Sequence, residues 1–220
     1  MMTLLFFTRT MNYKKFSFLV LLCFVGSQLL AQGYETGKIK RGVKVGVWMY
    51  YDQNEECPSL VIDYDKASVI CIKPDHEKYM VKLDSSNWVL SELSRQPRYI
   101  GSYQELMRIL GKNISYPKVA KAKRVQAQVF LEFEISEHGR ATKYQVYNDP
   151  NNYFTDEVIE AFKLVPDLWL AGIYQSKAVP AKMLIPIEFR INNLDADLNG
   201  MTESDFLGKK LNTVVVMAYL

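Results

Sequence analysis

The chain has 220 residues, 49% hydrophobic, 23% charged and 13% aromatic, which is typical of one or two globular domains and excludes disordered, collagen-like and coiled-coil chains. Its formal net charge is +3, but three of the 27 basic residues lie in the first 31 positions, which hold no acidic residue. The rest of the chain carries 24 basic and 24 acidic residues, so its charge gives no argument for a nucleic-acid partner.

The N-terminus has the pattern of a targeting segment. Lys14 and Lys15 precede an apolar run over residues 16–30, and the small residue Ala31 follows it. A basic region, a short apolar run and a small residue at the cleavage point are typical of a signal peptide. A membrane span needs about 20 apolar residues, and this run is shorter. We therefore expect residues 1–31 to be a signal peptide and the protein to be exported, with an uncleaved membrane anchor as the alternative.

Residues 32–83 are expected to form a small antiparallel β-meander. Short apolar runs alternate with turns in GVKVGVWMYYD, SLVIDYD, SVICI and KYMVKLD. Trp48 and Tyr50 are two positions apart, so both rings should lie on one face of a hairpin core. The first run resembles one copy of the MORN-like repeat of exported bacterial proteins, and an unrelated hairpin is the alternative. Cys57 and Cys71 could form a disulfide in an exported protein, and two separate thiols are the other interpretation.

Residues 84–96 are expected to connect the meander to a second unit at 97–191, where the pattern becomes mixed. The stretch SYQELMRILGKNI has apolar residues at helical spacing, with Ser102 expected to cap its start and Gly111 to end it. Apolar and polar residues then alternate in VQAQVFLEFEIS, which predicts a strand with one buried face. The turn EHGR leads to a second strand, ATKYQVYND.

A second helix and a third strand follow. The helix TDEVIEAFKLVP is expected to be capped by Thr155. In the strand AVPAKMLIPIEFRI, Pro186 has no N–H to donate, which favours a position at the edge of a sheet. The inward positions of these elements should form the core, namely Val129, Leu131, Phe133, Phe162, Ile185 and Ile187.

The order helix, strand, hairpin, strand, helix, strand over 97–191 resembles the C-terminal domain of TonB, the periplasmic energy transducer of Gram-negative bacteria. YPKVA at 116–120 is similar to the family's Tyr-Pro-x-x-Ala, and AVPAKMLIPIEF to its closing strand with a Pro-x-x-Phe ending. TDEVIEAFKLVPDLWLAG is similar to its helix followed by Pro and by a Trp near Gly. The resemblance implies an α+β fold, a three-stranded antiparallel sheet backed by two helices, preceded here by the β-meander.

The resemblance also implies a function. It indicates a periplasmic protein-interaction module that binds TonB-dependent outer-membrane receptors and supports energy-coupled transmembrane transport. In TonB the receptor's TonB box adds as a strand to the sheet edge, which is β-augmentation, and the strand at 178–191 is the candidate edge here. For Trp169 a plain core position is the alternative. The residues expected to contact the partner are Tyr116, Pro117, Trp169, Tyr174, Met183, Ile185, Ile187 and Phe189.

Two parts of a TonB transducer are not evident. TonB crosses the periplasm with a stiff proline-rich spacer, but this chain has 8 prolines and no proline-rich stretch. TonB also keeps its N-terminal helix, which engages the proton-motive-force complex of the inner membrane. That complex is a partner here only if the N-terminal segment is uncleaved. The alternative function is therefore a periplasmic or surface-associated scaffold without energy transduction.

The sequence contains no recognisable catalytic or metal-binding pattern. A metal site or a His-dependent hydrolase needs partner residues near its histidine, but His76 and His138 stand in hydrophilic turns. Asp63 and Asp65 alternate along one strand, which places both on an exposed face. No glycine-rich phosphate loop occurs. We expect no enzymatic activity, no cofactor, no metal and no nucleic-acid partner.

Residues 192–220 are expected to be a polar linker followed by an apolar strand. The last ten residues, LNTVVVMAYL, carry no charge, and such a strand seeks a partner in a sheet. Receptor TonB boxes have a Thr, a run of β-branched residues and an Ala, and this tail is similar in order and spacing. The tail could complete a sheet, or it could occupy the domain's own edge and exclude a receptor. The residues of this similarity are Thr213, Val214, Val215, Val216 and Ala218.

Overall fold

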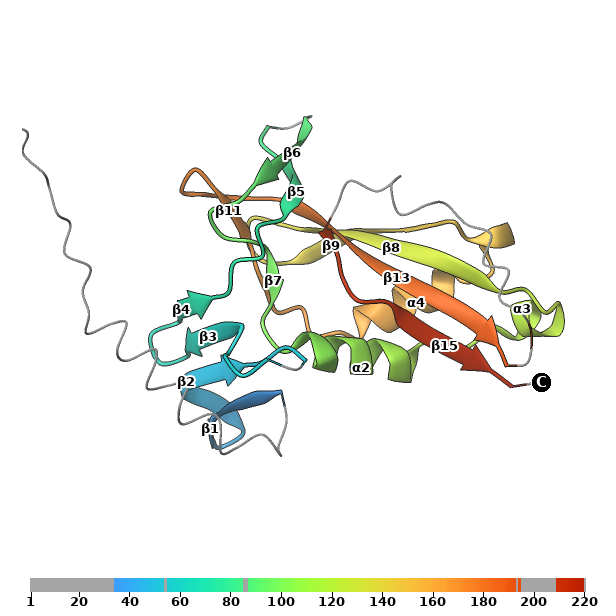
Figure 1. Cartoon of the computed structure of the whole chain (residues 1–220), viewed down its shortest axis with the longest axis horizontal. Coiled ribbons are helices and arrows are strands. Elements are labelled where there is room, and N and C mark those ends of the chain that lie inside the picture. Colours follow the sequence, from blue (N-terminus) through green and yellow to red (C-terminus); the bar gives the residue numbers. More distant parts are fainter. Residues whose placement is uncertain (1–33, 54, 85–86, 193, 195–208, 220) are drawn as a thin grey trace, which may run out of the picture.

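The computed structural model describes an α+β fold with a small sheet, a larger sheet and several helices (Figure 1). The described residues are 34–53, 55–84, 87–192, 194 and 209–219. The predicted signal peptide at 1–31 lies outside them, as does most of the polar linker that precedes the tail. Within these ranges, no helix has both the length and the apolar character that a membrane span requires.

The N-terminal unit is an antiparallel meander whose strands follow one another in chain order. Alternation along its second strand turns Trp48 and Tyr50 to the same side, where both are buried against Leu60 and Ile62. The predicted β-meander is confirmed, and Cys57 and Cys71 are not joined by a disulfide. The strands are β1 (Glu35–Lys40), β2 (Val43–Tyr50), β3 (Leu60–Asp63) and β4 (Ser68–Ile72).

The last strand expected in the meander lies in the larger sheet instead. This strand, β5 (Lys78–Lys82), pairs with β6 (Trp88–Glu92) and with β13 (Ala181–Ile191). Tyr79 and Val81 of β5 are buried in one cluster with Val179 and Ala181. Burial of these apolar side chains favours the pairing. The stretch 84–96 is accordingly more than a connection, because it contains β6.

The larger sheet has the order β6-β5-β13-β8-β9, and two strands of the C-terminal tail also pair with β13. β8, β9 and β13 are the three predicted strands, and they are antiparallel neighbours. The predicted fold class is confirmed. The sheet is larger than three strands because the β5–β6 hairpin and the tail add to the side of β13 that faces away from β8. The strands not yet placed are β8 (Ala127–Ile135), β9 (Ala141–Tyr147), β14 (Lys209–Lys210) and β15 (Val214–Ala218).

Helices α2 (Tyr103–Asn113) and α4 (Thr155–Lys163) cover the core face of the sheet, and α3 (Lys118–Ala122) lies at one end (Figure 1). Leu106 and Leu110 of α2 are fully buried in the same cluster as the inward residues of β8 and β13. All six predicted core residues are buried. The shorter elements are η1 (Pro150–Asn152), β7 (Arg98–Tyr99) paired with β10 (Trp169–Leu170), and β11 (Gly172–Tyr174) paired with β12 (Lys177–Val179).

The start of α2 agrees with the prediction and its end does not. The side chain of Ser102 accepts a hydrogen bond from the Glu105 backbone N–H at 3.1 Å, as an N-cap should. The prediction that Gly111 ends the helix was wrong, because the helix continues to Asn113. It ends where Ile114 turns to an extended backbone and buries its side chain. Packing of this apolar residue, and not a glycine, decides the end.

The cap of α4 also differs from the prediction. Thr155 is the first helical residue, and the capping group is the carboxylate of Asp149. Its Oδ2 accepts from the backbone N–H groups of Phe154 at 2.9 Å and Thr155 at 2.7 Å, and from the Thr155 hydroxyl at 2.6 Å. A carboxylate at this place satisfies unpaired N–H groups and complements the positive end of the helix dipole.

The meander and the larger sheet are joined through buried contacts. Arg98, only 4% exposed, donates from Nη2 to both carboxylate oxygens of Asp52, at 3.1 and 3.2 Å, and to Ser59 Oγ at 2.6 Å. Ile100 and Leu170 pack against the core of the meander. The meander and the larger sheet therefore share buried polar and apolar contacts.

Candidate partner-binding strand edge

The candidate site is the side of β13 that faces away from β8. Side chains alternate along a strand, and the odd-numbered residues of β13 point into the core. Four residues expected to contact a partner are among them and are fully buried: Met183, Ile185, Ile187 and Phe189. Their side chains hold the strand in place and are covered, so what β13 can offer a partner is its backbone.

The backbone groups of β13 also alternate between its two neighbours. The carbonyl of Leu184 accepts from the Leu211 N–H at 2.8 Å, and the Asn192 N–H donates to the Ala218 carbonyl at 2.8 Å. The even-numbered residues therefore direct their backbone groups to the tail side, and the odd-numbered ones to β8. Glu188 and Arg190 lie between these two points, so their N–H and C=O groups face the tail as well.

Pro186 marks a break in this edge. It is an even-numbered residue, and it has no N–H to donate to the tail. On that side β14 is in register with Met183 and Leu184, whereas β15 is in register with Ile187–Ile191. Pro186 favoured a position of β13 at the edge of the sheet, but the tail pairs with β13 on that side. The proline is tolerated because it falls between the two tail strands.

The tail strand β15 runs parallel to β13. Its register pairs Val214 with Ile187 and ends at Ala218 opposite Ile191. Three of its side chains, Val214, Val216 and Ala218, are buried, and Val214 and Val216 belong to the core cluster that includes Leu106 and Leu110 of α2. Val215 and Met217 point to the other face and are 50% and 42% exposed. The tail is therefore held by backbone pairing and by apolar packing against α2.

The sequence did not show this arrangement of the tail. All five residues of β15 are apolar, so no alternation shows which side chains are inward. Leu211, just before β15, is also buried. The sequence pattern around it does not predict this burial. Lys209, at the start of the tail, lies 3.3 Å from Glu77 and 3.6 Å from Asp75, and such ion pairs are too distant along the chain for local patterns to predict.

Tyr116 and Pro117 lie near the end of β13 where β15 is paired. The Tyr116 ring packs edge-on against Phe154 and Phe189, with ring centroids 5.9 and 5.5 Å apart. Its hydroxyl donates to the Val125 carbonyl at 2.5 Å, and burial raises the pKa of Tyr116 to about 12, so the hydroxyl keeps its proton. Pro117 directly precedes α3. Tyr116 thus supports β13 from the core side.

Trp169 and Tyr174 lie apart from the tail. Trp169 is 4% exposed and packs against Tyr99 and Phe133, with ring centroids 5.2 and 5.3 Å apart. This is the core position considered as the alternative. Tyr174 is half-buried in the β11–β12 hairpin and packs with Val179 and its neighbours. Trp169 and Tyr174 therefore lie near the start of β13, whereas Tyr116 lies near its end.

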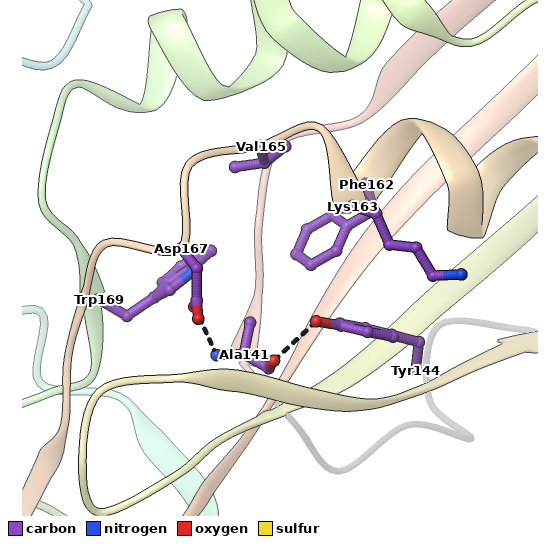
Figure 2. A pocket seen from close by; sticks show the side chains of 7 residues that line it. All are labelled: Ala141, Tyr144, Phe162, Lys163, Val165, Asp167 and Trp169. Carbon is purple, nitrogen blue, oxygen red and sulfur yellow. Dashed lines mark hydrogen bonds between the residues drawn. The ribbon is translucent and has the colours of Figure 1, made fainter.

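Beside Trp169 lies a small hollow with a volume of about 100 Å³ (Figure 2). Polar groups of Asp167, Tyr144 and Ala141 that line it already bond to one another. Asp167 accepts from the Ala141 N–H at 2.8 Å, and the Tyr144 hydroxyl donates to the Ala141 carbonyl at 2.6 Å. Small-molecule sites usually have volumes of about 300–1,000 Å³, so this hollow is a weaker candidate than the strand edge. It is lined by Ala141, Tyr144, Phe162, Lys163, Val165, Asp167 and Trp169.

The acidic and histidine residues considered in the sequence have local roles. Asp63 accepts from the backbone N–H groups of Asp65 and Lys66 at 3.1 and 3.2 Å, which stabilises a turn. Asp63 is buried rather than exposed, so the prediction of its exposed face was wrong. The side chain of His138 is 83% exposed. Among the described residues, no group of three His, Cys, Asp or Glu side chains is placed to hold a metal ion.

Comparison with known protein families finds a match over part of the chain. The family model described as Gram-negative bacterial TonB protein C-terminal matches residues 112–191. The match begins at the end of α2 and closes at the last residue of β13, so it covers β8, β9, α4 and β13 but neither the meander nor the tail. No curated protein matches the chain. Domains of this family are envelope-associated interaction modules that contact outer-membrane receptors.

Proposed function

On the premise that residues 112–191 are a TonB C-terminal-like domain, we propose that this protein is a periplasmic module that binds TonB-dependent outer-membrane receptors. The receptor's TonB box would add as a strand to β13, on the side that faces away from β8. In this mode backbone hydrogen bonds supply affinity, and alternate side chains supply selectivity. The bound receptor would then be coupled to energy-dependent transmembrane transport.

One observation carries the proposal. The tail side of β13 already pairs with an extended, uncharged segment, Val214–Ala218, in parallel register with Ile187–Ile191. The edge therefore has the backbone groups, the space and the apolar support from α2 that strand addition requires. A receptor box of the same apolar, uncharged type would find the same partners there. The side chain of Trp169 is buried, so the proposal does not depend on it.

The test is an NMR titration of the ¹⁵N-labelled chain with synthetic peptides that carry receptor TonB boxes from the same bacterium. Strand addition should shift the backbone amide signals of Glu188, Arg190 and Asn192, whose N–H groups face the tail side. The amides of Ile187 and Phe189 face β8 and serve as internal controls. A peptide with proline at a central box position whose N–H would face β13 loses a ladder hydrogen bond, and it should cause much smaller shifts at the same concentration.

Two outcomes would contradict the proposal. Shifts confined to the surroundings of Trp169 would move the site to the hollow. The absence of binding by any box peptide, even to a chain whose tail is displaced, would reject receptor binding by β13. The second outcome would favour the alternative, a periplasmic or surface-associated scaffold that transmits no energy.

A further inference from the structure

We propose that the tail, residues 209–219, is a built-in competitor that occupies the receptor-binding side of β13 and must leave before a receptor strand can pair there. The inference rests on the proposed function and adds its regulation. It assigns to the tail the role of lowering receptor affinity in the resting protein, beyond that of completing the sheet.

The first argument is that both strands would need the same backbone groups. The Leu184 carbonyl and the Asn192 N–H are bonded to Leu211 and Ala218 of the tail. Each backbone N–H can donate one good hydrogen bond. A receptor strand on this side of β13 therefore cannot form its ladder while the tail is in place.

The second argument is that the tail is the more weakly held neighbour of β13. β8 pairs with β13 in one uninterrupted ladder from Ala181 to Phe189. The tail pairs in two short pieces separated at Pro186. On its outer side, β15 has no strand neighbour among the described residues. The tail can therefore leave without opening the ladder between β8 and β13.

The third argument is that the chain between β13 and the tail is long enough for a parallel return. To pair in parallel, the chain must travel back from Ile191 to the level of Met183, a distance of about 27 Å. Residues 192–208 can span about 55 Å when extended. Parallel neighbours need a connection of about a dozen residues or more, and this segment is of that length.

The covalent connection between β13 and the tail also sets how far the tail lowers the affinity for a receptor. A tethered segment reaches an effective concentration of about 1 mM. A tail strand with an intrinsic Kd of about 0.1 mM would then be bound about nine-tenths of the time. Receptor affinity would be lowered about ten-fold, and removing the tail from β13 should restore it by the same factor.

The decisive experiment locks the tail with a disulfide. Glu188 and Val215 are register partners on the face of the sheet that points away from the core, so the pair Glu188→Cys with Val215→Cys, in a chain whose three native cysteines are serine, joins β13 to β15 on oxidation. The matched control joins the same position to β8, with Glu188→Cys and Gln128→Cys, which are also register partners. Non-reducing mass measurement confirms each bond, and circular dichroism confirms the fold.

We expect the oxidised tail lock to lose binding of a receptor TonB-box peptide, and reduction with dithiothreitol to restore it. The control lock should bind the peptide equally in both redox states. Equal binding by the oxidised and reduced tail lock would overturn the competitor inference and leave the proposed function standing. If the peptide binds none of these forms in either redox state, the proposed function is wrong, and the inference fails with it.

Discussion

Gly139 and Arg98 each connect two parts of the chain through close contacts of one residue. Gly139 has a φ of +69° in the turn between β8 and β9, and a Cβ atom there would overlap the carbonyl oxygen of Trp169. The turn thus needs both the backbone freedom and the small size of glycine. Arg98 places its charge between Asp52 and Ser59 of the meander. The geometry of single residues therefore fixes how the larger elements meet.

Replacing Gly139 should show how closely this turn is packed. We expect Gly139→Ala to lower the free energy of unfolding by about 1–3 kcal/mol, because of the positive φ and the contact with Trp169. Gly111→Ala is the matched control, since Gly111 lies inside α2 with open space around it. It should raise stability by about 0.5–1 kcal/mol. Urea unfolding monitored by circular dichroism measures both, and equal effects would contradict the packing argument.

Replacing Arg98 should weaken the junction between meander and sheet. We expect Arg98→Met to cost about 3 kcal/mol of unfolding free energy, because Asp52 loses its partner inside a largely buried contact. Arg108→Met is the control, since Arg108 forms an exposed pair with Glu105 at 2.6 Å. That change should cost less than about 1 kcal/mol. A similar cost for both variants would mean that the buried pair contributes no more than a surface pair.

At the scale of elements, β13 is the strand around which the molecule is organised. Its odd-numbered side chains hold the core, its odd-numbered backbone groups hold β8, and its even-numbered backbone groups hold the tail. One strand therefore serves both the stability of the fold and the proposed partner edge. Changes in the tail can be made on either face of β15 without altering β13 itself.

The two faces of β15 provide a matched pair of variants. Val216→Asp places a charge in the core beside α2, and we expect it to detach the tail and to raise the affinity for a receptor-box peptide about ten-fold. Val215→Asp places the same charge on the half-exposed face and should leave the affinity unchanged. Isothermal titration calorimetry measures both affinities. If both variants bind like the native chain, detachment of the tail does not govern receptor access.

These elements also show which parts of the fold the sequence predicts and which it does not. Alternation in β8 and helical spacing in α4 identified Phe133 and Phe162 as core residues, because in these elements apolar and polar positions differ. In β15 every residue is apolar, so its inward face and register depend on tertiary pairing alone. The sheet that β5 joins depends on contacts with a distant segment, and the capping of α4 by Asp149 depends on how the turn between residues 149 and 155 folds. The local sequence pattern predicts neither of these contacts.

At the scale of the whole molecule, the meander and the larger sheet share buried surface. Two separate domains, at 32–83 and 97–191, were expected from the sequence. In the structure, Arg98 bonds to the meander, and Ile100 and Leu170 pack against its core. We expect the two units to unfold together, because loss of one would leave a buried charge and apolar side chains of the other without partners.

Tryptophan fluorescence can test this cooperativity. Trp48 reports on the meander and Trp169 on the larger sheet, and both are buried. In variants that keep only one of the two, with Trp88→Phe in each, the urea midpoint from fluorescence should equal the midpoint from circular dichroism of the same variant. A fluorescence midpoint for Trp48 that falls clearly below the circular dichroism midpoint would support two separate domains.

The alternating backbone of β13 has a consequence for hydrogen exchange. The Ile191 N–H donates to Gln126 Oε1 at 2.7 Å on the β8 side, whereas the next N–H, of Asn192, donates to Ala218 at 2.8 Å on the tail side. If the tail opens without the rest of the sheet, even-numbered amides of β13 become accessible to solvent in that local opening. Odd-numbered amides exchange only when the ladder with β8 also opens. Neighbouring residues of one strand would then show two different protection levels, and the lower level, that of the even-numbered amides, gives the free energy that holds the tail in place.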